Sequence, residues 1–186
     1  MEPLFASVLV VALAEVGDKT QLLSLILAAR YRKPVPIVLG ILVATLANHF
    51  LAGALGAWIQ SLLSPAALRW VVGGSLLAVA AWTLKPDKFE GEVREATRYG
   101  VFALTCVVFF LAEMGDKTQV ATVILAVKYD ALAKVVLGTT AGMLVANVPV
   151  VWLGNAGAGR IPYRAVRFAA ALLFAGMGLA ALFMDA

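Results

Sequence analysis

Six long apolar blocks, separated by short polar stretches, make up almost the whole chain. Several of them reach the ~20 residues that a helix needs to cross the hydrocarbon core of a bilayer. We therefore predict six transmembrane helices, over residues 4–29, 35–59, 66–84, 99–127, 131–153 and 163–184. The one strongly hydrophilic stretch, residues 85–98, divides these blocks into two groups of three.

The composition is that of an all-α polytopic membrane protein. Hydrophobic residues make up 62% and charged residues 14% of the chain, whereas soluble domains average about 45–50% and 25%. We expect the first block to be retained as a membrane helix, because Glu2 stands where a signal peptide has basic residues. The single cysteine, Cys106, excludes an intrachain disulfide, and one Cys with one His excludes a Cys/His zinc cluster.

The net charge of +4 is explained by basic loops rather than by a nucleic-acid partner. Loops on the cytoplasmic side of membrane proteins collect Lys and Arg. The loops that must share one side hold ten basic residues, and the opposite side holds three, Arg69, Lys128 and Lys134. We expect an integral membrane protein with both termini on the non-cytoplasmic side.

The two groups of three blocks are copies of one unit. A shift of 98 residues places 13–31 on 111–129 with 12 of 19 positions identical. We predict a first repeat over 1–84, a cytoplasmic linker over 85–98 and a second repeat over 99–186. Because each repeat has three helices, the second enters the membrane from the opposite side, which makes the repeats inverted. Asn48 is one residue out of step with Asn147, so pairing these two requires a local shift.

The heptapeptide Glu-x-Gly-Asp-Lys-Thr-Gln occurs once in each repeat, at 15–21 and 113–119. We name these the first and second motifs. Ionisable groups at membrane depth are costly, rare and commonly functional. Both motifs lie near the middle of an apolar block, and paired helix breaks at the bilayer midplane are typical of secondary transporters with inverted repeats. We expect the motifs to meet near the bilayer centre.

The residue types of the motifs favour a site for a hard divalent cation. On a continuous helix Glu15 and Asp18 share a face, as do Glu113 and Asp116, so four carboxylates converge. Oxygen ligands suit Mg²⁺, Ca²⁺ or Mn²⁺. We expect six further residues to supply neutral oxygens to the ion or hydrogen bonds to the carboxylates: Thr20, Thr118, Gln21, Gln119, Asn48 and Asn147. We expect the helices to unwind at Gly17 and Gly115. Asn48 and Asn147 serve equally well as hydrogen-bonding groups between helices.

The lysines adjust the charge of this cluster. Glu15–Lys19 and Glu113–Lys117 pairs at (i, i+4) spacing would neutralise part of it, which leaves four negative and two positive charges. A divalent cation balances the remaining −2, and close carboxylates repel one another, which favours protonation. We therefore hypothesise that protons and the cation compete for the carboxylates. Whether Lys19 and Lys117 neutralise the site or gate it stays open.

Other interpretations of the motifs are weaker. The buried charges could lock helices together, although intramembrane polar contacts contribute little stability. A basic amino acid could be the exported solute, which an apolar pocket beside the cluster would favour. An intramembrane metal enzyme lacks a His ligand and a separate general base, so we expect no enzyme. His49 could relay protons or pack, and Met114 is expected to pack.

The twin motif resembles the signature of the cation/proton antiporter family that includes MneA-type bacterial manganese exporters, with relatives in Golgi and chloroplast membranes. That signature is Glu-x-Gly-Asp-(Lys/Arg)-(Ser/Thr) in each of two three-helix halves, and both copies here match it. The resemblance implies export of Mn²⁺ and/or Ca²⁺ against protons, with residues 15, 17–20, 113 and 115–118 functional, and a bacterial plasma membrane as the location. We expect no cofactor. The resemblance leaves open the choice between Mn²⁺ and Ca²⁺, the proton stoichiometry, the role of the 85–98 loop, and whether the chain forms a homo-oligomer.

Overall fold

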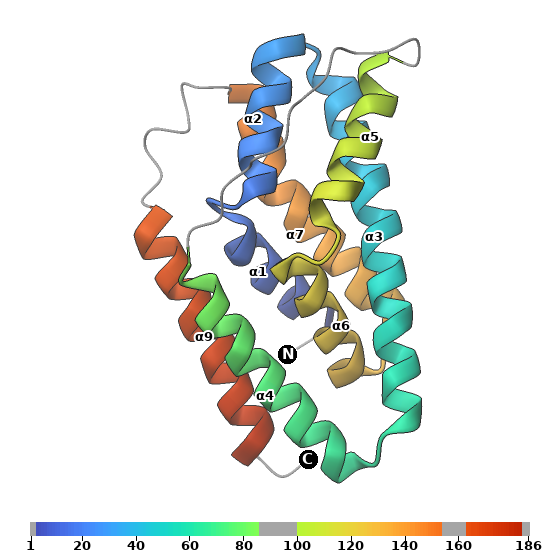
Figure 1. Ribbon diagram of the computed structural model, residues 1–186, viewed down its shortest axis with the longest axis vertical. Helices are drawn as coiled ribbons and strands as arrows, with labels where there is room; N and C mark the ends of the chain where they lie inside the picture. Colours follow the sequence, from blue (N-terminus) through green and yellow to red (C-terminus); the bar gives the residue numbers. More distant parts are fainter. Residues whose placement is uncertain (1–2, 86–99, 154–162, 184–186) are drawn as a thin grey trace.

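The computed structural model describes residues 3–85, 100–153 and 163–183, and these residues fold into helices alone (Figure 1). The helices are α1 (Pro3–Glu15), α2 (Lys19–Tyr31), α3 (Pro34–Leu62), α4 (Pro65–Thr83), α5 (Gly100–Glu113), α6 (Lys117–Tyr129), α7 (Leu132–Leu153) and α9 (Tyr163–Phe183). The expected loops at 85–98 and 154–159 fall almost wholly outside the described residues.

Every predicted apolar block contains helix, but two of the blocks are not single helices. The blocks over 4–29 and 99–127 are each divided into two helices, α1–α2 and α5–α6, at Gly17 and Gly115, where unwinding was expected. The assumption that Glu15 and Asp18 lie on one continuous helix was wrong. Four helices, α3, α4, α7 and α9, are long and apolar enough to cross a membrane by length and composition, and α1 and α5 are shorter apolar helices. The composition and length of these helices are those of an integral membrane protein.

Each interruption is a short turn with a glycine at its centre. Gly17 and Gly115 have φ of 78° and 74°, in the left-handed region that residues with a Cβ avoid. Asp18 and Asp116 follow in extended conformation, and their N–H groups donate to the carbonyls of Glu15 and Glu113 over 3.0 and 3.1 Å. Helix then resumes at the lysine. The same sequence therefore makes the same turn twice.

The two interrupted segments run in opposite directions past each other. In Figure 1, α1 and α6 lie in the lower half of the molecule and α2 and α5 in the upper half, so both turns lie near mid-height. The long helices α3 and α7 contact both interrupted segments, α1 packing on α7 and α5 on α3. The interrupted segments are thus held in the centre of the helical bundle.

The α1–α7 and α5–α3 contacts share one equivalent close approach. A Cβ added to Gly138 would lie 2.7 Å from the Cβ of Ser7, and one added to Gly40 would lie 2.6 Å from that of Thr105. Gly40 and Gly138, like Ser7 and Thr105, are 98 positions apart. Only glycine permits this close approach of the helix backbones. The sequence repeat therefore extends to the way in which the helices pack.

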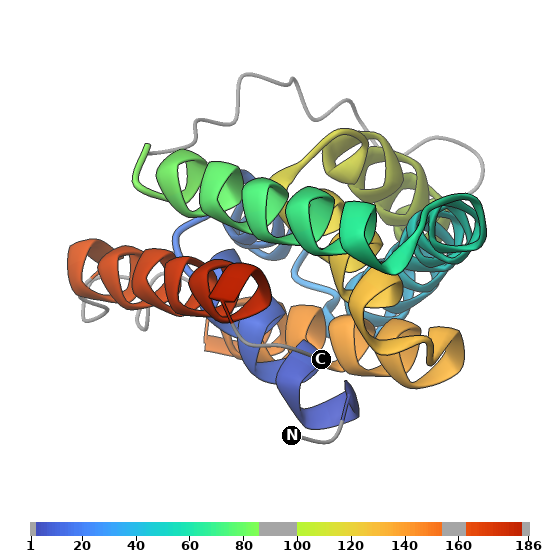
Figure 2. The same cartoon turned by 90° about the horizontal axis from the view of Figure 1, so that it is seen from below.

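Helices α4 and α9 pack side by side along one flank of the bundle, as Figure 2 shows. Large apolar side chains are exposed around the described helices, among them Phe5, Phe50, Trp58, Trp70 and Trp152. A soluble protein rarely exposes so much apolar surface, whereas a bilayer covers it. The polar residues of the motifs lie inside this apolar shell.

Candidate functional site

The first motif closes on itself around the turn at Gly17. Glu15 is the last residue of α1, and Asp18 precedes the first residue of α2. The hydroxyl of Thr20 donates a hydrogen bond to Oε1 of Glu15, and the N–H of Gly17 donates to Oε1 of Gln21 over 2.9 Å. These two bonds bridge the interruption and fix the carboxylate of Glu15 at the end of its helix.

The second motif makes the equivalent bonds. The hydroxyl of Thr118 donates to Oε2 of Glu113 over 2.8 Å, and the N–H of Gly115 donates to Oε1 of Gln119 over 2.6 Å. The threonines and glutamines that we predicted as cation ligands are thus engaged with their own motif. They orient the glutamates and stabilise the turns.

The two motifs meet through their aspartates and lysines. Lys117 Nζ lies 2.8 Å from Asp18 Oδ1, and Lys19 Nζ lies 3.1 Å from Asp116 Oδ1. The predicted Glu15–Lys19 pair and its Glu113–Lys117 counterpart were wrong. That prediction assumed continuous helices, and the turns at the glycines remove the (i, i+4) geometry. Each lysine instead binds the aspartate of the other motif.

The four carboxylates are all buried in the middle of the protein. Glu113 is close enough to Glu15 and to Asp116 to interact with both electrostatically. Oε2 of Glu15 and Oε1 of Glu113 are buried, and neither has a hydrogen-bond partner among the described residues. In this conformation the described residues contain no three His, Cys, Asp or Glu side chains arranged to hold one metal ion.

Asn147 of α7 links the two helices of the first motif. Its Nδ2 donates to Oε1 of Glu15 over 3.2 Å, and its Oδ1 accepts from the hydroxyl of Ser24 over 2.7 Å. Nearby, Nε2 of Gln21 donates to the carbonyl of Ala146 over 3.0 Å. Asn147 therefore acts here as a neighbour that orients the carboxylate of Glu15.

Asn48 of α3 binds the second motif in a different way. Its Oδ1 accepts a hydrogen bond from Nε2 of Gln119, and its Nδ2 donates to the carbonyl of Phe110 over 3.1 Å. Asn48 thus takes the place of Ala146, which lies 98 residues later and also accepts from the motif's glutamine. The suggested pairing of Asn48 with Asn147 was wrong, because the contacts follow the unshifted register.

The unshifted register places His49 at the position of Asn147. The His49 side chain is fully buried, and both of its ring nitrogens lack a hydrogen-bond partner in the described part of the chain. From the sequence, His49 could relay protons or pack, and it has no histidine counterpart in the second repeat. The constant spacing of 98 residues was the signal that could have identified it.

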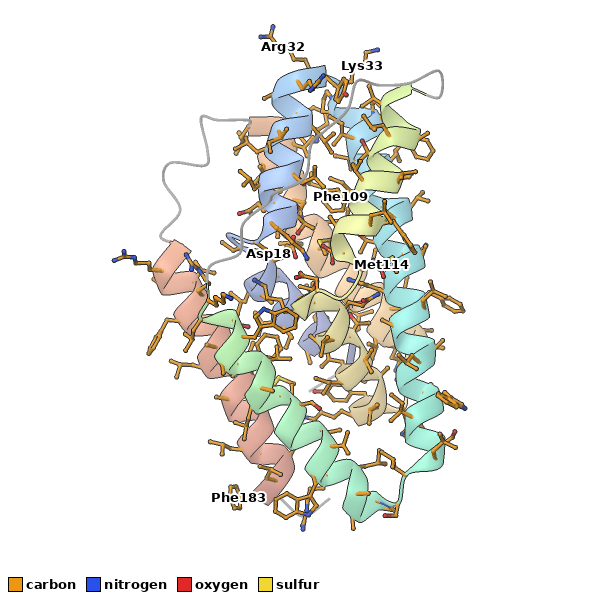
Figure 3. All side chains as sticks on the ribbon, in the orientation of Figure 1. Asp18, Arg32, Lys33, Phe109, Met114 and Phe183 are labelled. Carbon is orange, nitrogen blue, oxygen red and sulfur yellow. The ribbon has the colours of Figure 1, made fainter. Side chains whose placement is uncertain are left out.

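The site lies at mid-height along the long axis of the molecule. Figure 3 shows Asp18 and Met114 near the turns, Arg32 and Lys33 at one end of the long axis, and Phe183 at the other. Met114 is 56% exposed, so its side chain points away from the carboxylates, as expected of a residue without a ligand role. The charged residues of the motifs are therefore far from the basic end.

A cavity of about 660 Å³ lies away from the motifs, where α3, α4, α6 and α9 approach one another. Gln60, Leu68, Arg69, Val127 and Lys128 are among its lining residues, and no residue of either motif is. Its two basic side chains would repel a divalent cation.

Comparison with known proteins decides the family. A family model described as "Divalent cation/proton antiporter GDT1" matches residues 3–91 and 101–186. The chain belongs to this family. A Vibrio cholerae protein named "Putative manganese exporter" is 53% identical over 98% of this chain and 92% of its own.

More distant members of the family come from plants and cyanobacteria. A "GDT1-like protein 3" of Arabidopsis thaliana is 27% identical over 98% of this chain and 71% of its own. A GDT1-like protein of Synechocystis is 30% identical over 91% of both chains. No solved structure matches. The family is one of transporters, in agreement with the antiporter predicted from the twin motif and with the expectation that the chain is not an enzyme.

Proposed function

We propose that this protein exports Mn²⁺ and/or Ca²⁺ from the cytosol in exchange for protons, at a site formed where the two motifs meet. The observation that carries the proposal is the crossed ion pairing, Lys117 with Asp18 and Lys19 with Asp116, which joins the motifs in the middle of the protein. Family membership and the name of the Vibrio cholerae relative support a divalent cation, manganese in particular, as the cargo.

The charges of the site suggest a division of labour between aspartates and glutamates. Each aspartate has an ammonium group within 3.1 Å, so the two crossed pairs are neutral. The hydrogen bonds described for the glutamates come from neutral donors, the hydroxyls of Thr20 and Thr118 and the amide of Asn147. Lys117 and Lys19 also interact electrostatically with Glu15 and Glu113, but they form their ion pairs with the aspartates. A buried carboxylate whose charge is not fully balanced is costly and favours protonation. We infer that this conformation carries one proton on each glutamate.

Exchange follows from competition for the two glutamates. Oε2 of Glu15 and Oε1 of Glu113 have no hydrogen-bond partner among the described residues, so they are the atoms where protons and a cation would alternate. A divalent cation that displaces one proton from each glutamate leaves the charge of the site unchanged. The proposed exchange is therefore two protons for one divalent cation, with the aspartates and lysines retained as crossed pairs.

Closing the glutamates on a cation requires movement, because the described residues do not form a metal cage in this conformation. We propose six membrane spans in two inverted repeats, 1–84 and 99–186, joined by a cytoplasmic linker. Rocking one repeat against the other would bring the site alternately to each side. The excess of basic loops on one side supports termini outside the cytoplasm, and the Vibrio cholerae relative supports a plasma-membrane location. The oligomeric state has no part in this proposal.

The alternative cargo is a basic amino acid, which an apolar pocket beside the carboxylates would favour. The cavity of about 660 Å³ does not favour it, because its described lining includes Arg69 and Lys128 and no motif residue.

Transport in proteoliposomes tests the proposal. Vesicles loaded with a metal-sensitive dye receive an imposed pH gradient, and Mn²⁺, Ca²⁺ and Mg²⁺ are compared. We expect flux that follows the pH gradient in the parent protein. Glu15→Gln and Glu113→Gln should each abolish the flux, because glutamine neither releases a proton nor supplies a negative charge.

A matched control separates this result from damage to the fold. Ser61→Ala removes only a hydrogen bond to the carbonyl of Trp58 on the exposed surface, and it should transport like the parent. Flux that ignores the pH gradient, or that survives in both glutamine variants, would contradict the proposal.

A further inference from the structure

We propose that His49 is the hydrogen-bond partner of Glu113 in the oppositely facing state, as Asn147 is the partner of Glu15 in the state described here. The inference rests on the proposed transport function, and it assigns a positioning residue to the second motif. It starts from three residues that meet at the first motif, Glu15, Asn147 and Ser24, and their counterparts 98 positions away.

The first set is engaged. Asn147 donates to Glu15 and accepts from Ser24, so that one amide joins the end of α1 to α2 through α7. We call Glu15, Asn147 and Ser24 the closed clasp. Their counterparts under the 98-residue shift are Glu113, His49 and Thr122. We call these the open clasp, because no hydrogen bond joins them to one another.

Each residue of the open clasp has a hydrogen-bonding atom that either lacks a partner among the described residues or is bound within its own helix. Oε1 of Glu113 and both ring nitrogens of His49 are buried without a hydrogen-bond partner among the described residues. The hydroxyl of Thr122 donates to the carbonyl of Thr118, one turn earlier in its own helix. A buried polar group without a partner is costly, so these groups favour a conformation in which they bind one another.

The chemistry of the two clasps matches. The amide of Asn147 uses one acceptor atom, for Ser24, and one donor atom, for Glu15. A neutral imidazole also has one acceptor nitrogen and one N–H donor. His49 can therefore accept from the hydroxyl of Thr122 and donate to Glu113, without any change in its charge.

The contacts of α3 show what must move. Asn48 faces α5 and α6, where it binds the carbonyl of Phe110 and the amide of Gln119. One helical turn beyond His49, a Cβ on Gly53 would lie 2.6 Å from Leu132 and 3.0 Å from Val136 of α7. His49 shares the α7-facing side of α3 with Gly53, so a displacement of α3 relative to α5 and α6 is needed to bring its ring to Glu113.

Inverted repeats make such a displacement the expected difference between the two states. Because the repeats have opposite orientations in the membrane, giving each repeat the conformation of the other exposes the site to the opposite side. The clasp that is closed in one state is then open in the other. Asn147 and His49 would hold Glu15 and Glu113 in turn, so each glutamate is oriented during one half of the cycle.

Paired measurements of transport and binding test this role. Mn²⁺ flux in proteoliposomes and Mn²⁺ binding to purified protein are compared for the parent, His49→Asn and His49→Leu. We expect His49→Leu to lower turnover at least ~10-fold, which is the usual cost of removing a group that orients a ligand. Its Mn²⁺ affinity should stay within about twofold, because the closed clasp is intact. His49→Asn restores an amide like that of Asn147 and should keep most of the flux.

Two further variants separate positioning from packing. Thr45→Val changes a buried side chain one turn before His49 that belongs to neither clasp, and it should transport like the parent. Thr122→Val should slow turnover, and combining it with His49→Leu should add little, because both remove the same linkage.

The outcomes are distinguishable from failure of the proposed function. A parent protein that moves no divalent cation overturns the proposed function and this inference with it. A transporting parent with His49→Leu at parental turnover, or with His49→Asn as slow as His49→Leu, overturns the role of His49 alone. Additive losses in the Thr122→Val and His49→Leu double variant would also contradict it.

Discussion

The first and second motifs share six of seven residues and the same local fold, yet their surroundings differ. Both turns have a glycine at positive φ, a threonine bound to the glutamate and a glutamine bound to the glycine N–H. Beyond these local contacts the equivalence ends. Glu15 is also held by Asn147, whereas Glu113 has no partner from a neighbouring long helix among its described hydrogen bonds.

Burial of the lysines shows the same asymmetry. The side chain of Lys117 is 1% exposed and that of Lys19 is 24% exposed, although each binds an aspartate of the other motif. The duplicated sequence therefore determines the conformation of the turn, whereas the surrounding helices, including α3 and α7, determine the contacts and burial of each motif. A transporter that opens to one side at a time needs such unequal halves, and the predictions below test how far the inequality extends.

The largest expected effect distinguishes glutamates from aspartates within each motif. Glu15→Gln should abolish transport and leave stability nearly unchanged, because glutamine resembles the protonated glutamate that we infer. Asp18→Asn should abolish transport and also destabilise the protein, since it leaves the buried Lys117 without its counter-charge. Flux and thermal unfolding in detergent, measured on the same preparations, check both. Equal destabilisation by the two variants would contradict the division of labour.

The next effect compares the two lysines. Lys117→Ala should cost about 3–5 kcal/mol of unfolding free energy, because it breaks a fully buried ion pair. Lys19→Ala should cost less than Lys117→Ala, because the Lys19 side chain is 24% exposed and its ion pair is less completely desolvated, although Asp116 is buried. Denaturant unfolding in detergent measures both.

A double variant provides the control for the lysines. Asp18→Asn combined with Lys117→Ala removes both charges and should recover part of the stability that Lys117→Ala loses. If Lys19→Ala proves as costly as Lys117→Ala, the two halves are not unequal in the way described.

A smaller effect is expected at the asparagines. Asn147→Ala removes the donor to Glu15 and should weaken Mn²⁺ binding about 10-fold, the low end of what neighbours of metal ligands contribute. Asn48→Ala touches Gln119 and the carbonyl of Phe110 but no glutamate, so its effect should be at least several-fold smaller. Titration of purified protein with Mn²⁺ measures both, and the reverse order would contradict the asymmetry.

The smallest effect is expected where the motifs differ in sequence. Met114→Val gives the second motif the residue of the first, at a position whose side chain is 56% exposed. Transport should change less than about twofold, as surface substitutions away from a site commonly do. A large change in the ratio of Mn²⁺ to Ca²⁺ flux would show that Met114 reaches the cation after all.

Much of this account could be predicted from the pattern of residues. The apolar blocks predicted the positions of the helices, and the paired glycines marked where two of them are interrupted. The crossed ion pairs between the aspartate of one motif and the lysine of the other were not predicted. Spacing along a helix does not predict which side chains meet once the helix ends at Glu15 and Glu113. A turn of three residues redirects every later side chain.

His49 was missed for a different reason. Asn48 and Asn147 were compared because they are the same residue type. The position of a residue in the repeat, however, determines whether its side chain faces the glutamate. The structure shows that Asn48 is equivalent to Ala146, because Gln119 binds Asn48 as Gln21 binds Ala146. His49 is therefore equivalent to Asn147.

The most direct test of the account is the number of protons released when the purified protein binds one Mn²⁺, measured with a pH indicator in weak buffer. The account predicts about two protons for the parent and about one for Glu15→Gln or Glu113→Gln where binding persists, because each glutamate contributes one. Binding of Mn²⁺ without proton release would contradict the claim that protons and cation compete for the two glutamates.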